Sequence, residues 1–469
     1  MKNNSLNPVP KNIIIAAWAI ALGAITPMLD STMVNIAVKD LTASFHTTLD
    51  WVQWGITGYL LALAMAVPIS GWLMNQFNSK YVFISAVVGF GITSFITGLS
   101  WNISVFIAFR LIQGFSAGII TTLMSTMLIK IAGEAYIGRV IAIVSTPMIL
   151  GPIFGPVIGG FIVHASSWRW IFFINVLITL IAVPIMVRTL PHFCPFNKMK
   201  SLDIVGMLHL CLISITMIYG LTQATKYASF VNNTTLTSMI IGILLIVSYI
   251  IYNRRNQYNT VLPTNLFKHR NFGASSSGLF LSNIAILGPM IILPLFFQDF
   301  FHFTSISAAL MLMPQGVGML ITRPLIGKLT DQYGPKVIVL VSAFFVLIST
   351  IPFISVSSHS SIIWIELALF LRGCFVGGVM LPLTSGAYLG LKNEQLTEAG
   401  VGINIIENLG SSFGGALIAT IVATFINTLP TTAHNILVGY HAGFLVSMLA
   451  IICLFLPASF LNKKISTMQ

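Results

Sequence analysis

The chain has 469 residues, of which 56% are hydrophobic and only 7% are charged. Soluble domains carry about 25% charged residues, so this composition excludes a set of ordinary water-soluble domains and indicates a protein that lies mostly in lipid. The formal net charge is +12, an excess that is also typical of nucleic-acid-binding proteins, so the positions of the cations must decide its meaning.

Fourteen apolar stretches are long enough to cross a membrane, because a bilayer core is crossed by about 20 helical residues. The runs are too long for the strands of a membrane barrel. In chain order the expected spans are 12–38, 51–74, 81–100, 103–128, 138–163, 168–190, 204–224, 234–252, 272–298, 304–327, 336–356, 360–389, 399–427 and 437–461. The sequence therefore predicts an all-α polytopic membrane protein with fourteen transmembrane helices.

The cations segregate to one side of this expected topology. If the N-terminus is cytoplasmic, 17 of the 23 Lys and Arg residues fall in the N-terminal segment, the cytoplasmic loops or the tail. The others lie on the outer side (Lys39, Arg169 and Lys226) or within spans (Arg110, Arg323 and Arg372). This bias follows the positive-inside rule, so we expect both termini in the cytoplasm and no nucleic-acid partner.

The first span holds a carboxyl group, Asp30. An acid inside a span is a functional candidate by default, because stranding it in lipid is costly. Thr26 shares its helix face, and Arg110 lies in the outer half of the fourth span, so a switchable contact between Asp30 and Arg110 is geometrically allowed. We expect Asp30 to gain and lose a proton and Arg110 to support it; the alternative is a permanently paired structural acid.

The fifth span carries a run of paired glycines and prolines that allow helices to approach closely and to bend. The run contains Gly151, Pro152, Gly155, Pro156, Gly159 and Gly160. We expect it to form a tight, bendable contact between two halves of the molecule.

The thirteenth span holds a polar stripe at helical spacing, which suits the wall of a wet cavity. Its members are Asn404, Glu407, Asn408 and Ser411. The alternative is that these side chains join helices by hydrogen bonds, but that task does not require a carboxylate. Arg323 lies near the cytoplasmic end of its own span and is expected to reach out to the interface.

A short internal repeat divides the chain. Pro68-Ile-Ser-Gly71-Trp-Leu73 recurs as Pro324-Leu-Ile-Gly327-Lys-Leu329, an offset of 256 residues. Repeated halves place a transporter's ligand site at their interface near the membrane midplane. The expected parts are a cytoplasmic N-terminus at 1–11, a six-helix bundle at 12–190, a linker with two additional transmembrane helices at 191–271, a second six-helix bundle at 272–461 and a cytoplasmic tail at 462–469.

Several motifs carry a resemblance to a known family. They are Leu29-Asp30-Ser-Thr32-Met-Val34-Asn35-Ile-Ala37, Arg110-Leu-Ile-Gln113-Gly114, the glycine-proline run of span five, Trp168-Arg169-Trp170-Ile-Phe-Phe-Ile-Asn175, and Leu293-Pro294-Leu295-Phe-Phe-Gln298. Over nearly its whole length the chain resembles the major facilitator superfamily, and within it the fourteen-span drug:proton antiporters. The resemblance implies proton-driven export of hydrophobic, often cationic, compounds.

Two departures from the family pattern stand out. The inner-loop motif G-x-L-A-D-R-x-G-R-K begins here at Gly71 but has Asn75 in place of its acid, whereas the second copy keeps Asp331. Asn75 can accept a hydrogen bond from a helix end but carries no charge, so the ionic latch expected at the first copy is in question. The second departure is Glu407, where relatives often carry a basic or neutral residue.

The expected function is a secondary active transporter, a proton-coupled antiporter that exports hydrophobic or cationic drugs by alternating access. The proton-coupling candidates are Asp30, Glu407 and Arg110. The candidates for the substrate cavity are Thr26, Trp54, Tyr59, Phe296, Phe297, Gln298, Asn404 and Asn408. The candidates for gating are Gly71, Asn75, Asp331 and the glycine-proline run.

Other functions remain open on the sequence alone: export of an endogenous metabolite (a siderophore, lipid or amino acid), or a non-transporting sensor on the same fold. No enzyme activity, cofactor or metal is expected, since the sequence has no phosphate-binding loop and no H-E-x-x-H motif. The expected partners are small hydrophobic or cationic substrates, protons and lipid, for a monomer in the cell inner membrane.

Overall fold

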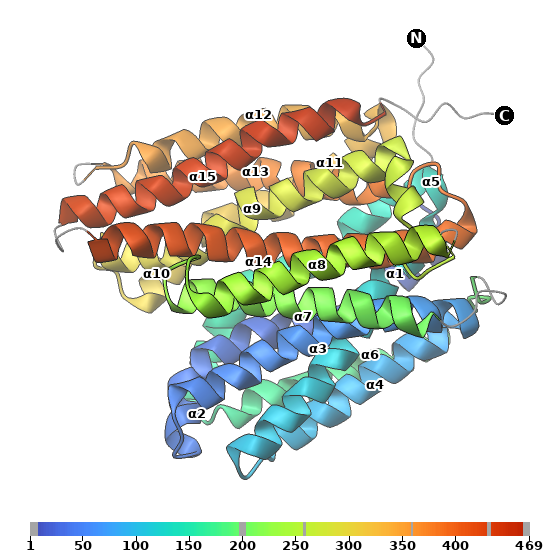
Figure 1. Cartoon of the computed structure of the whole chain (residues 1–469), viewed down its shortest axis with the longest axis horizontal. Helices are drawn as coiled ribbons and strands as arrows, with labels where there is room; N and C mark the ends of the chain where they lie inside the picture. Colours follow the sequence, from blue (N-terminus) through green and yellow to red (C-terminus); the bar gives the residue numbers. More distant parts are fainter. Residues whose placement is uncertain (1–7, 197–202, 257–258, 358–359, 429–432, 463–469) are drawn as a thin grey trace.

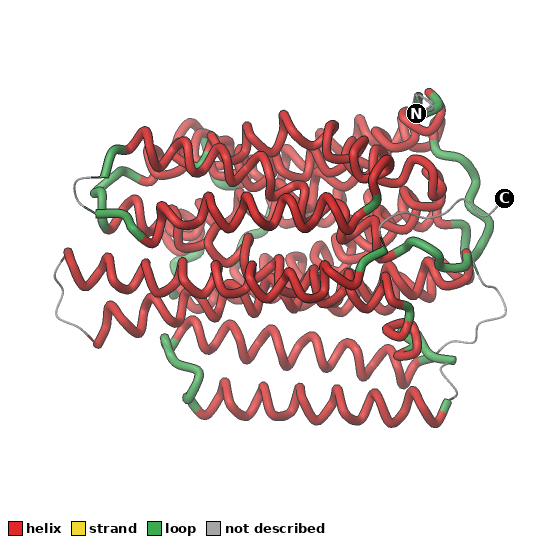
Figure 2. The backbone as a smooth tube through the Cα atoms, turned by 90° about the horizontal axis from the view of Figure 1, so that it is seen from above, coloured by secondary structure: helices red, strands yellow, loops and turns green. Residues whose placement is uncertain are grey.

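The computed structural model describes residues 8–196, 203–256, 259–357, 360–428 and 433–462. All regular structure within these ranges is helical, and Figure 2 shows the helices lying along one common axis. The first half of the chain forms α1 (Lys11–Met33), η1 (Val34–Ala37), α2 (Val38–Ser44), α3 (Leu49–Gln76), α4 (Ser79–Gly98), α5 (Ile103–Ala165), α6 (Arg169–Thr189), α7 (Ile204–Lys226) and α8 (Asn233–Arg255). The second half forms η2 (Thr264–Lys268), α9 (Arg270–Asp299), α10 (Ser305–Met311), α11 (Met313–Tyr333), α12 (Pro335–Ile354), α13 (Ile362–Ala387), η3 (Asn393–Gln395), α14 (Leu396–Thr428) and α15 (Ala433–Phe460).

Short polar residues fix where several helices begin, because a side-chain oxygen can accept one of the free N–H groups of the first turn. Asn78 accepts from the amide of Lys80 at α4, Asn102 from Val105 at α5, and Asp203 from Gly206 at α7. Gly334 ends α11 at φ 80°, a left-handed conformation that favours glycine, and Pro335 then starts α12.

Twelve helices of the described residues are long and apolar enough to cross a membrane. The expected spans 138–163 and 304–327 are not among them. The first belongs to α5, whose 63 residues would extend about 95 Å as one helix, three times a bilayer core. Gly133 breaks that helix, with φ 59° and ψ 175°, so α5 consists of two segments.

Two other expected spans differ in their ends. The stretch 304–327 is divided at Leu312 into the short α10 and the longer α11, and α11 runs on to Tyr333. The stretch 12–38 leaves α-geometry at Val34, where four residues form a tighter 3₁₀ turn before α2. Hydropathy alone could not locate these breaks, because the residues on either side are equally apolar.

Helices α7 and α8 lie between the helices of the N-terminal part of the chain and those of its C-terminal part. Figure 1 shows α3, α4 and α6 on one side, α12, α13 and α15 on the other, and α7 and α8 across the front. Helix α7 packs against both α3 and α14. The ring of Tyr219 stacks on Trp54 at 6.2 Å, and the Cys211 thiol lies 3.3 Å from the carbonyl oxygen of Met65. Helix α7 therefore contacts helices from both the N-terminal and the C-terminal part of the chain.

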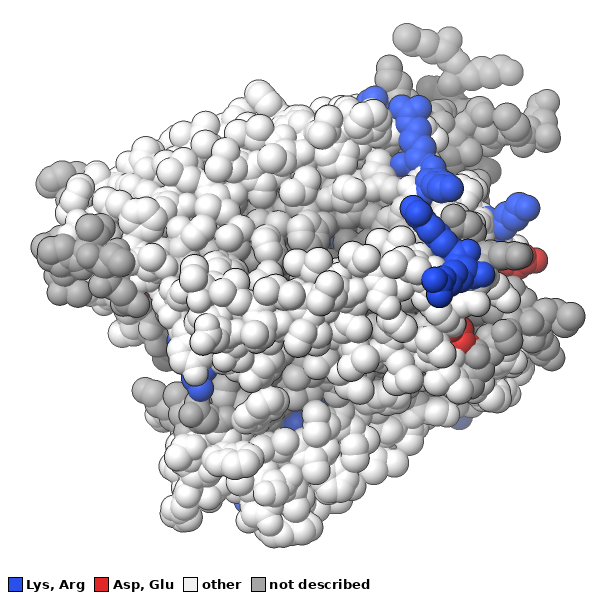
Figure 3. All heavy atoms as spheres, in the orientation of Figure 1, with Lys and Arg blue, Asp and Glu red and all other residues white. Residues whose placement is uncertain are grey.

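Lys and Arg side chains gather at one end of the face that Figure 3 shows. Arg254 and Arg255 supply two cations to the last turn of α8. This distribution is the one that the positive-inside rule describes for a cytoplasmic side.

Candidate functional site

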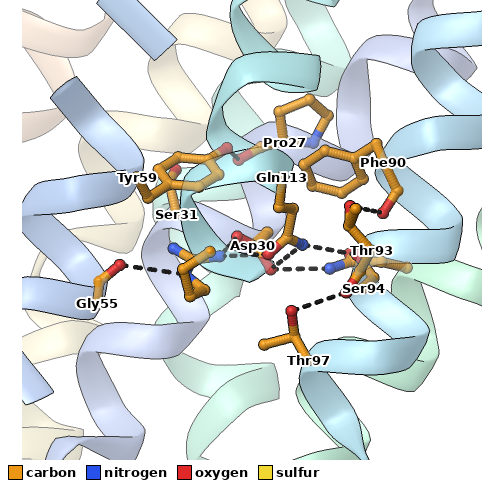
Figure 4. A network of polar contacts seen from close by, with 12 residues as sticks. Pro27, Asp30, Ser31, Gly55, Tyr59, Phe90, Thr93, Ser94, Thr97 and Gln113 are labelled. Carbon is orange, nitrogen blue, oxygen red and sulfur yellow. Dashed lines mark hydrogen bonds and ion pairs between the residues drawn. The ribbon is translucent and has the colours of Figure 1, made fainter. Parts of the chain in front are cut away.

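Asp30 is fully buried on α1, one turn after Pro27, and it lies at the centre of a polar network (Figure 4). Arg110 of α5, 1% exposed, forms an ion pair with its Oδ2. Gln113 of α5 donates to its Oδ1 at 3.2 Å, and Asn175 of α6 donates to the same oxygen at 2.9 Å. Three donors from two helices thus surround one carboxylate, and each makes a charge-assisted contact with it.

A second layer holds these donors in place. Gln113 also donates to Ser94 of α4 at 2.6 Å, and its own oxygen accepts from Arg110 at 2.8 Å. The Nε of Arg110 donates to the carbonyl of Gly55, and its guanidinium lies 4.1 Å from the centre of the Tyr59 ring. The network therefore connects α1, α3, α4, α5 and α6.

The structure brings Asp30 and Arg110 together, as the sequence allowed, and it adds partners that the sequence analysis did not assign. Gln113 and Asn175 belong to motifs that carry the family resemblance, but the sequence predicted no role for them or for Ser94. The available signal was their chemistry: amide side chains inside otherwise apolar spans need partners there. Their orientation toward Asp30 depends on the rotation of α5 and α6, which no motif encodes.

Glu407 occupies a different environment on α14. It is half-buried and accepts one hydrogen bond, from Thr384 of α13 at 3.3 Å. Its neighbours in the stripe bond to their own helix: Asn404 donates to the carbonyl of Gly400 and Ser411 to that of Asn408. These two hydrogen bonds thus lie within α14 and do not join it to another helix.

The aromatic candidates for a substrate cavity fall in separate places. Phe296 and Phe297 are fully buried in an aromatic cluster with Tyr440 and Phe444, so they belong to a packed core of the second half. Tyr59 is fully buried beneath Arg110.

The remaining cavity candidates are equally scattered. Trp54 is 44% exposed. Thr26 is buried and donates to Gly23 of its own helix, and Gln298 donates to Pro294 of its own helix. Asn408 is half-buried beside Glu407 in the stripe of α14. The eight candidates therefore do not line one common space in this conformation.

The two copies of the inner-loop motif differ in what they contact. Asp331 accepts from the amide of Gly138 and from Nε of Arg139, both at 2.8 Å, and so joins α11 to the second segment of α5. Burial raises the pKa of the Asp331 carboxyl, while Arg139 and the Gly138 amide oppose that rise.

The first copy makes an apolar contact instead. A Cβ on Gly71 would lie 2.6 Å from a methyl group of Val401, so α3 and α14 touch at this point. Asn75 is 5% exposed, and its Oδ1 has no hydrogen-bond partner in the described structure. The helix-end hydrogen bond expected of Asn75 is therefore not made.

The glycines of the fifth span pack within the first half, which corrects the expected contact between halves. A Cβ would lie 3.1 Å from Met28 at Gly151, 2.0 Å from Thr32 Oγ1 at Gly155, and 3.2 Å from Met33 at Gly159. The spacing of four residues places these glycines on one face, and that face lies on α1. Gly160 faces away, with only Ile36 at 4.0 Å. The side chains of Pro152 and Pro156 lie outside the described residues.

Arg323 also differs from its expectation. Its place near the end of its expected span predicts an interfacial side chain, but it is only 7% exposed and packs against Gly377 of α13. Its side chain runs into the bundle because a glycine on the facing helix leaves room for it.

Comparisons with known proteins agree with this architecture. The family model of the Major Facilitator Superfamily matches residues 20–415. The chain is 27% identical over 417 residues to a "Multidrug resistance protein B homolog" of Mycobacterium tuberculosis, covering 88% of this chain and 77% of that protein. It is 26% identical over 412 residues to "Multidrug export protein EmrB" of Escherichia coli, covering 87% and 80% of the two chains.

Solved structures share the fold at low identity. The proton:xylose symporter XylE superimposes with a TM-score of 0.66 at 14% identity, covering 95% of both chains. The human organic anion transporter MFSD10 superimposes with a TM-score of 0.63 at 15% identity, covering 95% of this chain and 100% of that one. With a family match over most of its length and this helical fold, the chain belongs to the Major Facilitator Superfamily and is a multi-pass membrane transporter rather than an enzyme.

Proposed function

We propose that the chain is a proton-coupled antiporter that exports hydrophobic and cationic compounds by alternating access. One observation carries the proposal: Asp30 is fully buried inside α1, yet it is held by dedicated donors. An ionisable group kept in this way marks a proton or ion pathway by default. The names of the multidrug relatives support the class of substrate.

The network around Asp30 supports a reversible proton step. Asn175 donates to Asp30, while its own Oδ1 has no partner in the described structure. A flip of this amide by about 180° exchanges donor for acceptor, so Asn175 would then accept the proton of a neutral Asp30. Arg110 keeps Gly55 and Gln113 as acceptors when the carboxyl loses its charge. Both protonation states therefore have hydrogen-bond partners.

We further propose that the full topology has fourteen spans, with both termini cytoplasmic and α7 and α8 inserted between two six-helix bundles. The second segment of α5 and the broken pair α10 and α11 would supply the two spans beyond the twelve. The gathering of Lys and Arg at one end supports this orientation in a cell inner membrane (Figure 3). The proposed unit is a monomer.

Two carboxyl groups would set the stoichiometry. One charge crossing a potential of 100 mV is worth about 2.3 kcal/mol, but exchange of one proton for one monovalent cation moves no net charge. Asp30 and Glu407 together would carry two protons per cation and recover the electrical term. A stoichiometry of one proton in both the parent and Glu407→Gln would eliminate Glu407 as the second carrier.

The test is efflux of a lipophilic cationic dye from energised vesicles, with and without a protonophore. We expect the parent to lose efflux when the protonophore is added, and Asp30→Asn to lose gradient-driven efflux while it still exchanges dye for dye. Asp40→Asn is the matched control, because Asp40 is exposed on α2. Undiminished gradient-driven efflux by Asp30→Asn would remove Asp30 from the mechanism.

A further inference from the structure

Arg323 is a buried cation whose donors are unused. Its side chain is 7% exposed, and Nε and Nη1 have no hydrogen-bond partner in the described structure. Its Cγ and Nε lie 3.3 Å and 3.6 Å from the position of a Cβ on Gly377, so the chain runs closely over α13. A buried guanidinium without acceptors is costly, and a site that keeps one requires an anionic group to complete it.

Glu407 is an acidic side chain that likewise has no oppositely charged partner among the described residues. Its one hydrogen bond comes from the Thr384 hydroxyl, and the ion pairs found among described residues do not include it. The hydroxyl of Tyr388, the residue that directly follows α13, is buried and also lacks a partner in the described structure. The carboxylate therefore has no cation to neutralise it in this conformation.

Both groups lie along the same face of α13. Arg323 packs on Gly377, and Glu407 bonds to Thr384, seven residues later. Seven residues correspond to about two turns, or about 10 Å along the helix, and return to the same face. The two opposite charges are thus presented on one side of one helix without forming an ion pair with each other.

The other buried arginines do not share this state. Arg110 is paired with Asp30, and Arg372 donates to the carbonyl of Ala285 at 2.7 Å and to Thr350 at 3.3 Å. Their guanidinium groups have structural partners. Among these three arginines, Arg323 alone has no hydrogen bond to another described residue.

We propose that Arg323 and Glu407 form a two-ended binding site for amphoteric compounds, with a carboxylate at Arg323 and an amine or delocalised cation at Glu407. This inference rests on the proposed export of hydrophobic compounds and narrows their class. The planar guanidinium suits a carboxylate because it can offer two parallel N–H donors. A ligand that carries an anionic group and a cationic group on one scaffold would satisfy both side chains at once.

The test is equilibrium binding to the purified full-length protein of two forms of one rhodamine dye. The free acid is a zwitterion, whereas its methyl ester is a plain cation of the same shape. We expect Arg323→Gln to raise the Kd of the free acid about tenfold relative to that of the ester, a change of about 1.4 kcal/mol. Arg323→Lys should restore part of the difference. Glu407→Gln should weaken both dyes, since both carry the cation.

Arg372→Gln is the matched control, because this buried arginine already has acceptors. It should leave the ratio of the two Kd values unchanged. If the parent binds the ester and Arg323→Gln alters both dyes equally, or neither, the two-ended site is overturned while the proposed export stands. If the parent binds neither dye, both are overturned. Monitoring monodispersity and thermal unfolding of each variant separates lost binding from lost folding.

Discussion

The two halves of the molecule treat their buried charges in opposite ways. In the first half, Asp30 and Arg110 neutralise each other within a network that reaches five helices. In the second half, Glu407 and Arg323 lie on one face of α13 and leave each other unpaired. Asp30 and Arg110 are neutralised by each other without a ligand, whereas Arg323 and Glu407 each need an oppositely charged partner. The difference therefore suits a proton site in the first half and a ligand site in the second.

The halves also differ at the inner-loop motif. The copy in the second half forms an ion pair through Asp331, whereas the copy in the first half packs Gly71 on Val401 and leaves Asn75 without a bond from its oxygen. Of the two copies of the motif, the second thus forms an ion pair. The two copies have similar sequences but make different contacts.

The largest expected effect concerns the paired and unpaired arginines. Arg110→Met should lower the free energy of unfolding by about 3–5 kcal/mol, because it leaves Asp30 as an uncompensated buried charge. Arg323→Met should be neutral or stabilising, since it removes a cation without stranding a partner. Thermal unfolding of both variants in the same detergent compares them directly. Equal losses would show that Arg323 has a structural partner after all.

Asp331→Asn should have the next largest effect. It replaces a charge-assisted contact worth about 1.5–3 kcal/mol with a neutral one, and so should open the contact between α11 and α5. The measurement is the alkylation rate of a cysteine placed at Thr397, a residue that is 1% exposed beside Gly71 and Asn75. We expect faster labelling in Asp331→Asn and no change in Asn75→Ala.

Acidification should act on the same contact. Because burial raises the pKa of Asp331, the carboxyl takes up its proton at a higher pH than an exposed Asp does, and the ion pair with Arg139 weakens. The folded chain then binds this proton more tightly than the unfolded chain, so Asp331 adds no acid instability to the fold. If labelling of Thr397→Cys does not rise relative to that of the exposed Cys194 on mild acidification, this expectation is contradicted.

The smallest expected effect is that of Asn75→Asp, which restores the acid of the family motif. Asn75 and Asp203 line the same small pocket with Gly71, so a second carboxylate there would lie near an existing one. We expect a destabilisation of this contact of at most about 1 kcal/mol, read as slightly faster labelling at the Thr397 position. Slower labelling would mean that the first copy can still form a latch.

Hydropathy was enough to predict a polytopic helical fold, because a span is defined by its length and composition. It also drew attention to Asp30 and Arg110, since charged residues inside spans are rare. Hydropathy did not predict which neighbouring helix each face of a helix contacts. The glycines at 151–159 contact α1 rather than the other half, and Phe296 lies in a packed cluster, because packing against neighbouring helices sets rotation.

The sequence likewise did not predict how deeply a charged side chain is buried or which residues become its partners. Arg323 is four residues from the expected end of its span, which favours an interfacial position, but Gly377 on the facing helix gives its side chain room inside. Gln113 and Asn175 become partners of Asp30 only when α5 and α6 are placed beside α1. Such contacts join positions up to 145 residues apart, and local patterns do not record them.

Gly133, whose φ is positive, joins two segments of α5 that make different contacts. The segment before Gly133 carries Arg110 and Gln113. The segment after it includes Gly138 and Arg139, which donate hydrogen bonds to Asp331, and packs on α1 through Gly151 and Gly155. Among the described residues outside its own stretch of helix, no atom lies within 4 Å of the position of a Cβ on Gly133. Gly133 is therefore a point at which the segment of α5 that carries Arg110 can turn relative to the segment that contacts Asp331, within one continuous backbone.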